Sequence, residues 1–269
     1  MGHSQQQSVA DRWQTLPPTP ESLPATSAGY ADVNGVKIYH KVYGKGSPVL
    51  FLHGGMANTD WWNLQVAAVA KYHTVVLVDT RGHGRSTRDE RPFSYNQMAD
   101  DAIALMDKLG FDRAHIVGWS DGAITGLDLA MRYPERIAGV FAFAPNVTTK
   151  GVDHDCVKKL AFADFVERAG HEYEAKSATP TEYASFVEQI RAMWATQPNW
   201  STQDLNQITV PVEMVGAQYD EAIFRDHLLY MADSIPNAGL VMLPNVSHFA
   251  QVQDPEPFNF AILHFLGDK

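Results

Sequence analysis

The chain has 269 residues, of which 45% are hydrophobic, 19% are charged and 11% are aromatic, and its formal net charge is −10. This length allows one or two domains with a large buried core, and the composition excludes a mainly disordered or collagen-like chain. The acidic balance, without any large cluster of Lys and Arg, argues against nucleic acid or anionic lipid as a partner. The longest apolar runs, such as Ile137–Pro145, are too short to span a membrane.

Residues 1–28 are rich in Gln, Ser, Thr and Pro and show no apolar periodicity, so we expect a tail. The stretch has no basic segment followed by an apolar one, which a signal peptide requires. The sequence as given therefore favours the cytoplasm by default. A periplasmic or secreted location stays open if a signal peptide has been removed.

After the tail, strand patterns alternate with helix patterns, which predicts an α/β fold with a mostly parallel sheet covered by helices on both faces. Asn34-Gly35, between the first two strands, is a strong hairpin signal. The expected strands are Tyr30–Val33, Val36–Tyr43, Pro48–Leu52, Val75–Val78, His115–Gly118, Ile137–Phe143, Val212–Gly216 and Leu240–Leu243. The main expected helices between them are Trp61–Tyr72, a segment ending near Leu109, and Ala123–Arg132.

One interval breaks this alternation. Residues 146–205 carry helical spacing of apolar side chains and no strand pattern. A long insertion inside an α/β domain is more often a functional lid than a structureless loop. We therefore expect one core, formed by residues 29–145 and 206–269, with residues 146–205 inserted as a helical cap.

A G-x-S-x-G pattern, Gly118-Trp119-Ser120-Asp121-Gly122, lies between an expected strand and an expected helix. This setting is typical of a nucleophile elbow, in which the serine occupies a sharp, strained turn. Ser120 is therefore the candidate nucleophile. The earlier strand Pro48–Leu52 ends in His53-Gly54-Gly55, whose backbone N–H groups could stabilise an oxyanion. We expect donors from Gly55 and Asp121, with Met56 as the alternative to Gly55.

A serine nucleophile needs a base, and the base needs a carboxylate that orients it. Asp220 follows the expected strand Val212–Gly216, and His248 follows the last expected strand. This order, serine then acid then histidine, predicts a catalytic triad of Ser120, Asp220 and His248. Glu221 is the neighbouring alternative acid, whereas His227 and His264 lie in helical segments and suit the base role poorly.

Together these pieces resemble the serine hydrolases of the α/β-hydrolase fold, over roughly residues 29–269. The segment Asp79–Ser86 is also similar to a structural loop of that family. The resemblance implies an eight-stranded, mostly parallel sheet, a cap over the active site and catalysis without a cofactor. It also implies that the Asp and Arg of this segment stabilise their loop, a role that we favour over a catalytic pair.

The predicted activity is acyl transfer, with carboxylesterase as the first choice. Lactonase and C–C bond hydrolase are alternatives on the same triad. A ligand receptor with little turnover is the alternative from another class, although the complete triad argues against it. The expected partner is a small-molecule ester or lactone, and the chain is expected to be a monomer or a homodimer.

The expected substrate is neutral or apolar, because no basic residue is clearly placed near the motifs. Trp61, Trp119, Met193 and Trp194 are the candidate pocket residues. No metal site is expected, since the histidines show no ligand spacing. Cys156 is the single cysteine, so it cannot form a disulfide within the chain, and a buried structural role is favoured over catalysis.

Overall fold

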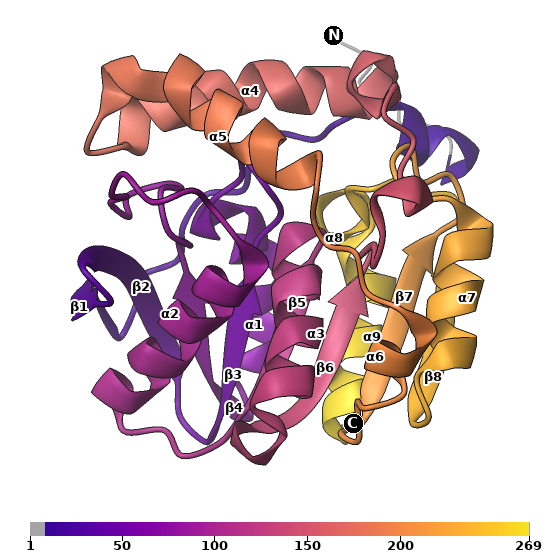
Figure 1. The fold of residues 1–269 in the computed structure, drawn as a ribbon, viewed down its shortest axis with the longest axis horizontal. Helices are drawn as coiled ribbons and strands as arrows, with labels where there is room; N and C mark the ends of the chain where they lie inside the picture. The colour runs from indigo at the N-terminus through magenta and orange to yellow at the C-terminus, as the bar shows by residue number, and fades with distance from the viewer. Residues whose placement is uncertain (1–8, 269) are drawn as a thin grey trace, which may run out of the picture.

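The computed structural model describes residues 9–268, and its centre is an eight-stranded sheet with the order β1-β2-β4-β3-β5-β6-β7-β8 (Figure 1). The pairs β1–β2 and β2–β4 are antiparallel, and the other neighbouring pairs are parallel. The predicted eight-stranded, mostly parallel sheet is thus confirmed. The strands are β1 Ser27–Val33, β2 Val36–Gly44, β3 Ser47–Leu52, β4 His73–Val78, β5 Ala114–Trp119, β6 Ile137–Phe143, β7 Val212–Ala217 and β8 Ala238–Leu243.

The first two strands are joined at Asn34 and Gly35. Both residues have positive φ, 47° and 86°, in the left-handed region that the favoured two-residue hairpin turns require. Asn and Gly adopt this region at little cost, which explains why the hairpin signal in the sequence was informative.

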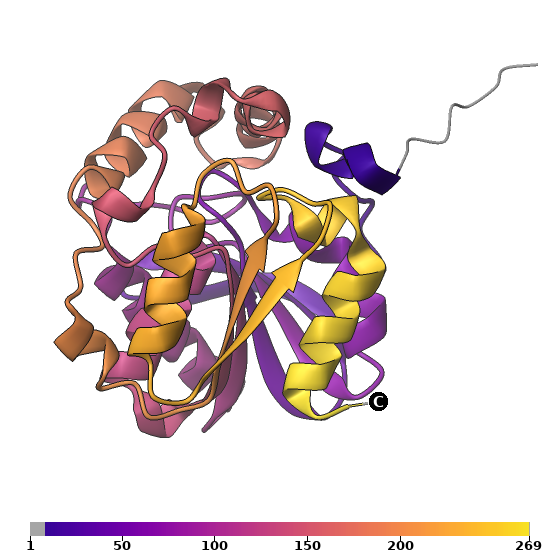
Figure 2. The same cartoon turned by 90° about the vertical axis from the view of Figure 1, so that its right-hand side faces the viewer.

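Alternate residues of the central strands face opposite sides of the sheet, as expected from the period of two. On β3, Val49 and Phe51 belong to one apolar cluster, and Leu50 and Leu52 belong to the other. Helices α1 and α9 contribute to the first cluster, and α2, α3 and α7 to the second, so the sheet is covered on both faces (Figure 2). These helices, with α8, are α1 Asn63–Val69, α2 Tyr95–Leu109, α3 Asp121–Arg132, α7 Arg225–Ser234, α8 Ala250–Gln253 and α9 Pro255–Leu266. Within residues 9–268, no helix combines the length and apolarity needed to cross a membrane.

Short 3₁₀ helices connect several of these elements. One of them precedes α1, so the single helix expected over Trp61–Tyr72 is in fact a 3₁₀ turn followed by a shorter α-helix. The Asn58 side chain accepts a hydrogen bond from the N–H of Asp60 and starts that turn. The 3₁₀ helices are η1 Val9–Gln14, η2 Thr59–Trp62, η3 Pro134–Arg136, η4 Thr149–Gly151, η5 Cys156–Lys158 and η6 Pro180–Glu182.

The segment between β6 and β7 contains α4 Leu160–Lys176, α5 Tyr183–Trp194 and α6 Thr202–Leu205, and none of the named strands. Helices α4 and α5 cross above the carboxyl ends of the strands, whereas α6 lies lower in the view (Figure 1). Phe165 and Tyr173 of α4 and Phe186 and Ile190 of α5 are buried in the apolar cluster that also covers one face of the sheet. These helices therefore continue the core instead of forming a second one.

Residues 9–26 lie along the body of the protein, which differs from the expected tail over residues 1–28; residues 1–8 lie outside the described residues. The Trp13 ring stacks on Tyr219, with centroids 4.6 Å apart. Leu16 is buried, and its carbonyl accepts a hydrogen bond from Arg168 of α4. The sequence lacked any periodic signal here because the segment is held by isolated side chains and by main-chain carbonyls.

Candidate active site

Ser120 occupies a strained turn between β5 and α3. Its φ of 53° and ψ of −119° place a residue with a side chain in a region that is normally costly. The flanking glycines make this turn possible, because the backbone approaches closely on both sides. A Cβ on Gly118 would lie 2.5 Å from Cα of Ala123, and one on Gly122 would lie 2.0 Å from the Leu52 carbonyl oxygen.

His248 lies in the loop between β8 and α8, and its ring faces Asp220. The Nδ1 atom of His248 is 3.0 Å and 3.1 Å from the two carboxylate oxygens of Asp220. The N–H groups of Ala222 and Ile223 each donate to Oδ1 of Asp220 at 2.9 Å, which fixes the carboxylate. Burial acts to lower the pKa of His248, but the charge and hydrogen bond of Asp220 outweigh it and raise that pKa.

The alternative acid, Glu221, is placed differently. Its Oε2 accepts a hydrogen bond from the backbone N–H of His248 at 3.0 Å, whereas Asp220 contacts the ring. The residue pair Asp220-Glu221 therefore holds the same histidine at two points.

Ser120 and His248 line one cavity of about 350 Å³, together with Asp121 and Trp194. Four residues predicted from the sequence are thus brought to the same cavity. The other pocket candidates are not among the described residues that line it. These are Trp61, Trp119 and Met193. Their side chains are buried in the apolar cluster between the sheet and the helices above it.

Asp121 lines the cavity beside Ser120 and is held by two donors that are far away in the sequence. The hydroxyl of Tyr95 donates to Oδ1 at 2.8 Å, and Nε1 of Trp194 donates to Oδ2 at 2.8 Å. Burial raises the pKa of Asp121 to about 6, although both donors favour the ionised form.

The expected oxyanion donors lie close to this carboxylate. A Cβ on Gly55 would be 2.4 Å from Oδ2 of Asp121, so the glycine turn after β3 comes against the start of α3. Asp121 is the first residue of that helix, and its N–H has no acceptor within the helix. Met56, the alternative donor, has a φ of 63° in the same turn.

Several cavity residues were not predicted from the sequence. Arg191, His154, Asn146, Gln197 and Tyr95 bring polar or charged groups to it. They come from separate segments that share no motif or spacing, so no sequence signal was available. Two of them are basic, which differs from the expectation that no basic side chain is placed at the pocket.

Cys156 also lines the cavity, on η5. Burial raises the pKa of its thiol to about 12, so the reactive thiolate is disfavoured. Among residues 9–268, no group of His, Cys, Asp or Glu side chains is arranged to hold a metal ion.

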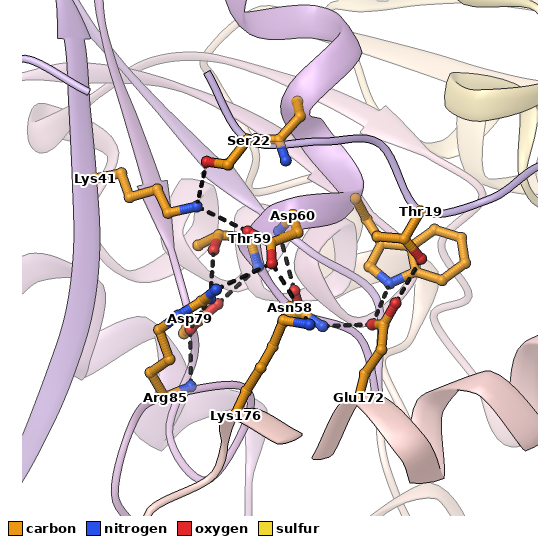
Figure 3. A network of polar contacts seen from close by, with 12 residues as sticks. Thr19, Ser22, Lys41, Asn58, Thr59, Asp60, Asp79, Arg85, Glu172 and Lys176 are labelled. Carbon is orange, nitrogen blue, oxygen red and sulfur yellow. Dashed lines mark hydrogen bonds and ion pairs between the residues drawn. The ribbon is translucent and has the colours of Figure 1, made fainter. Parts of the chain in front are cut away.

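The Asp79–Ser86 loop is bonded to itself and to η2. Oδ1 of Asp79 accepts from the N–H of Thr59 at 2.6 Å, and Oδ2 accepts from the N–H of Arg85 at 2.8 Å. Arg85 also donates to Asp60 at 3.0 Å, within a larger network of polar contacts (Figure 3). Asp79 and Arg85 thus lie in this network and are not among the described residues that line the cavity.

The two histidines near this loop are poor candidates for a base. Burial lowers the pKa of His53 to about 4 and that of His83 to about 3. Both rings are therefore neutral at pH 7. His53 Nε2 accepts a hydrogen bond from the N–H of Thr80, which is a structural contact.

Comparison with known proteins agrees with this architecture. The family model of the alpha/beta hydrolase fold matches residues 47–206, more than half of the chain. The chain belongs to the α/β-hydrolase-fold family. The family model and the hydrolase relatives below support the conclusion that the protein is a hydrolase.

Individual relatives extend the similarity beyond the matched range. RutD of Azorhizobium caulinodans is 28% identical over 261 residues, covering 89% of this chain and 98% of RutD. The serine hydrolase BPHL of Mus musculus is 27% identical over 256 residues, covering 90% of this chain and 86% of BPHL. The solved structure of Est816, described as an N-acyl homoserine lactone degrading enzyme, has a TM-score of 0.69 and 26% identity. The aligned region covers 88% of this chain and 100% of the Est816 chain.

Proposed function

We propose that the protein is a serine hydrolase that cleaves small carboxylic esters through an acyl-enzyme intermediate. The observation that carries this proposal is a single cavity bounded by Ser120, at a strained elbow, and by His248, whose ring is held by Asp220. The similarity to a relative named as a serine hydrolase supports the same chemistry.

In this mechanism the Oγ atom of Ser120 attacks the ester carbonyl carbon, and His248 accepts the hydroxyl proton. Asp220 keeps the imidazole in the required tautomer and stabilises the imidazolium. The backbone N–H groups of Gly55 and Asp121 stabilise the tetrahedral oxyanion, and each such donor contributes about 3 kcal/mol in known hydrolases. His248 then protonates the leaving alcohol and activates the water that releases the acid.

We also propose that residues 29–145 and 206–269 form the catalytic core and that residues 146–205 form a cap that shapes the substrate site. The cap supplies apolar walls through Val152, Val157 and Phe162 and polar groups through Arg191 and Gln197. A cavity of about 350 Å³ with these walls suits small esters whose acyl group is apolar.

The decisive experiment replaces Ser120 with Ala. Hydrolysis of p-nitrophenyl acetate and butyrate is expected to fall by at least about 10³-fold, because the nucleophile is lost. Ser185→Ala is the matched control, since Ser185 lies exposed on α5, and it should keep the activity of the unaltered protein. A phosphonate inhibitor should label Ser120, as mapped by mass spectrometry. Undiminished turnover by S120A would refute the proposal.

A lactone is the second candidate substrate, and the observation that favours it is the similarity to Est816 over the whole of that chain. Ring opening of a lactone needs the same nucleophile, base and oxyanion donors. A panel of linear esters and lactones of matched acyl length distinguishes the two by the ratio of their kcat/KM values. A higher kcat/KM for lactones throughout the panel would make lactonase the preferred assignment.

A further inference from the structure

The residue after the triad acid is a second buried carboxylate that also contacts the catalytic base. Glu221 is 6% exposed, and its Oε2 is 3.0 Å from the backbone nitrogen of His248. Asp220 contacts the ring of the same histidine. One loop after β7 therefore holds both the main chain and the side chain of His248, which itself lies in the loop after β8.

We propose that Glu221 is a positioning residue for the base: it fixes the main chain of His248 while Asp220 orients the ring. This inference rests on the proposed function, in which His248 is the base. A hydrogen bond from a backbone amide to a carboxylate is stronger than one between neutral groups, so the contact restricts the loop that carries the histidine.

The second oxygen of Glu221, Oε1, adds to the cost of placing this carboxylate beside the base. Among the residues that the structure describes, Oε1 is buried without a hydrogen-bond partner. An unsatisfied buried oxygen costs folding free energy, so its retention next to the base is consistent with a functional role. Burial, with a smaller contribution from the charge of Asp220, raises the pKa of Glu221 to about 7.

Glu221 and His248 also act on each other electrostatically. The carboxylate charge of Glu221 raises the pKa of His248, alongside the larger contribution of Asp220 and a smaller one from Asp121. The titratable groups that face Glu221 from other elements are His248, the thiol of Cys156 on η5 and the ammonium of Lys159. Lys159, before α4, lies with its Nζ 3.5 Å from the Glu221 carbonyl oxygen.

The sign of the effect follows from these charges. Ionised Glu221 favours the imidazolium form of His248, so removal of that charge lowers the pKa of the base. Glu221→Gln keeps an oxygen that accepts the His248 N–H but carries no charge. Glu221→Ala removes both the acceptor and the charge. The two variants therefore separate positioning from electrostatics.

The first test measures the ring pKa of His248 by NMR titration, which needs no turnover and so stands even if the ester hypothesis fails. In E221Q the pKa of His248 is expected to fall by about 0.5 to 1 relative to the unaltered protein. Glu213→Gln is the matched control. Glu213 is a half-buried glutamate of β7 whose pKa is also raised by burial, whereas the acidic groups that act on His248 are Asp220, Glu221 and Asp121. E213Q should leave the pKa of His248 unchanged.

The second test uses kinetics and amide exchange. E221Q should keep kcat within about threefold at high pH, with the acidic limb of kcat/KM moved to lower pH. E221A should lower kcat by roughly 10–100-fold with little change in KM, and the His248 amide should exchange faster with solvent. Unaltered kcat and unaltered amide exchange in E221A overturn the positioning proposal, and an unchanged pKa of His248 in E221Q overturns the electrostatic contribution of Glu221. If S120A retains full activity, the ester function fails separately.

Discussion

The buried carboxylate of the candidate active-site cavity, Asp121, differs from Asp60 of the network in Figure 3 in the groups with which it is paired. In the network, Nζ of Lys41 is 2.7 Å from Asp60, and Arg85 donates to the same carboxylate at 3.0 Å. Burial alone would raise the pKa of Asp60, yet these two cations lower it. In the cavity, Asp121 is bonded to the neutral donors Tyr95 and Trp194, and its pKa is raised to about 6.

The difference shows why Asp60 and Asp121 differ in ionisation. At Asp121, hydrogen bonds from neutral donors do not compensate the loss of hydration, whereas two cations do so at Asp60. In the network, Asp60 is thus held in its ionised form, and Glu172 and Lys176 join α4 to the segment after β3. The cavity has in Asp121 a carboxylate that can change its protonation state near pH 6.

Asp220 contacts the ring of His248, which becomes a cation during the proposed reaction, so its replacement should have the largest effect. Asp220→Asn is expected to lower kcat/KM for p-nitrophenyl esters by roughly 10³–10⁴-fold. The ring of His248 then loses the carboxylate that holds it in the required tautomer and stabilises the imidazolium. Asp107→Asn is a control, since Asp107 only pairs with Arg136 at the surface. A loss below tenfold in D220N would contradict the role of Asp220.

Replacement of Glu172 tests how much the network in Figure 3 contributes to stability. Its carboxylate accepts hydrogen bonds from Thr19, Asn58 and Trp61 at 2.5, 2.6 and 3.0 Å. Glu172→Ala should lower the free energy of unfolding by about 2–4 kcal/mol, because these donors lose their acceptor. Glu182→Ala, which breaks an exposed pair with Arg88, should cost less than about 1 kcal/mol. Urea unfolding of both variants measures the contrast, and equal losses would contradict it.

Replacement of Asp121 is expected to have the smallest effect on the protein, and this effect on the free energy of unfolding depends on pH. Its pKa in the folded protein is about 6, above the ordinary value of 3.8, so folding favours the protonated form. Stability therefore falls as pH rises from about 4 to about 6 and stays lower above that range. Asp121→Asn is neutral at every pH and should remove this loss.

The variant D121N is expected to unfold with the same free energy as the unaltered protein near pH 4. At pH 7.5 its free energy of unfolding should be higher by on the order of 1–3 kcal/mol. Urea unfolding at the two pH values measures the difference. A gain of equal size at both pH values would show that the protonation of Asp121 is not its cause.

Much of the fold could be predicted because its signals are local. Aliphatic strands such as Val75–Val78 and the Asn34-Gly35 turn have side chains whose conformational preferences act within a few residues. The elbow is equally local, since Gly118 and Gly122 leave the space that the turn at Ser120 needs. The helical spacing of α4 and α5 was visible for the same reason.

The surroundings of the site could not be predicted in this way. Trp61 and Trp119 lie near the motifs in sequence, but their large apolar rings are buried in the core and do not line the cavity. Arg191 and His154 line it although no pattern links them to the motifs. Burial and cavity lining depend on how separate elements pack, and a single sequence does not carry that information.

The sequence by itself determined the sheet, the elbow and the order of Ser120, Asp220 and His248, because strand period, glycine turns and motif order are properties of neighbouring residues. Only the tertiary structure decided which of two adjacent carboxylates faces the ring of His248 and which binds its backbone. It also decided that Asp121 meets Tyr95 and Trp194, from two other helices, instead of a cation. These choices depend on distances between segments far apart in the chain, and those distances set the pKa values on which the chemistry depends.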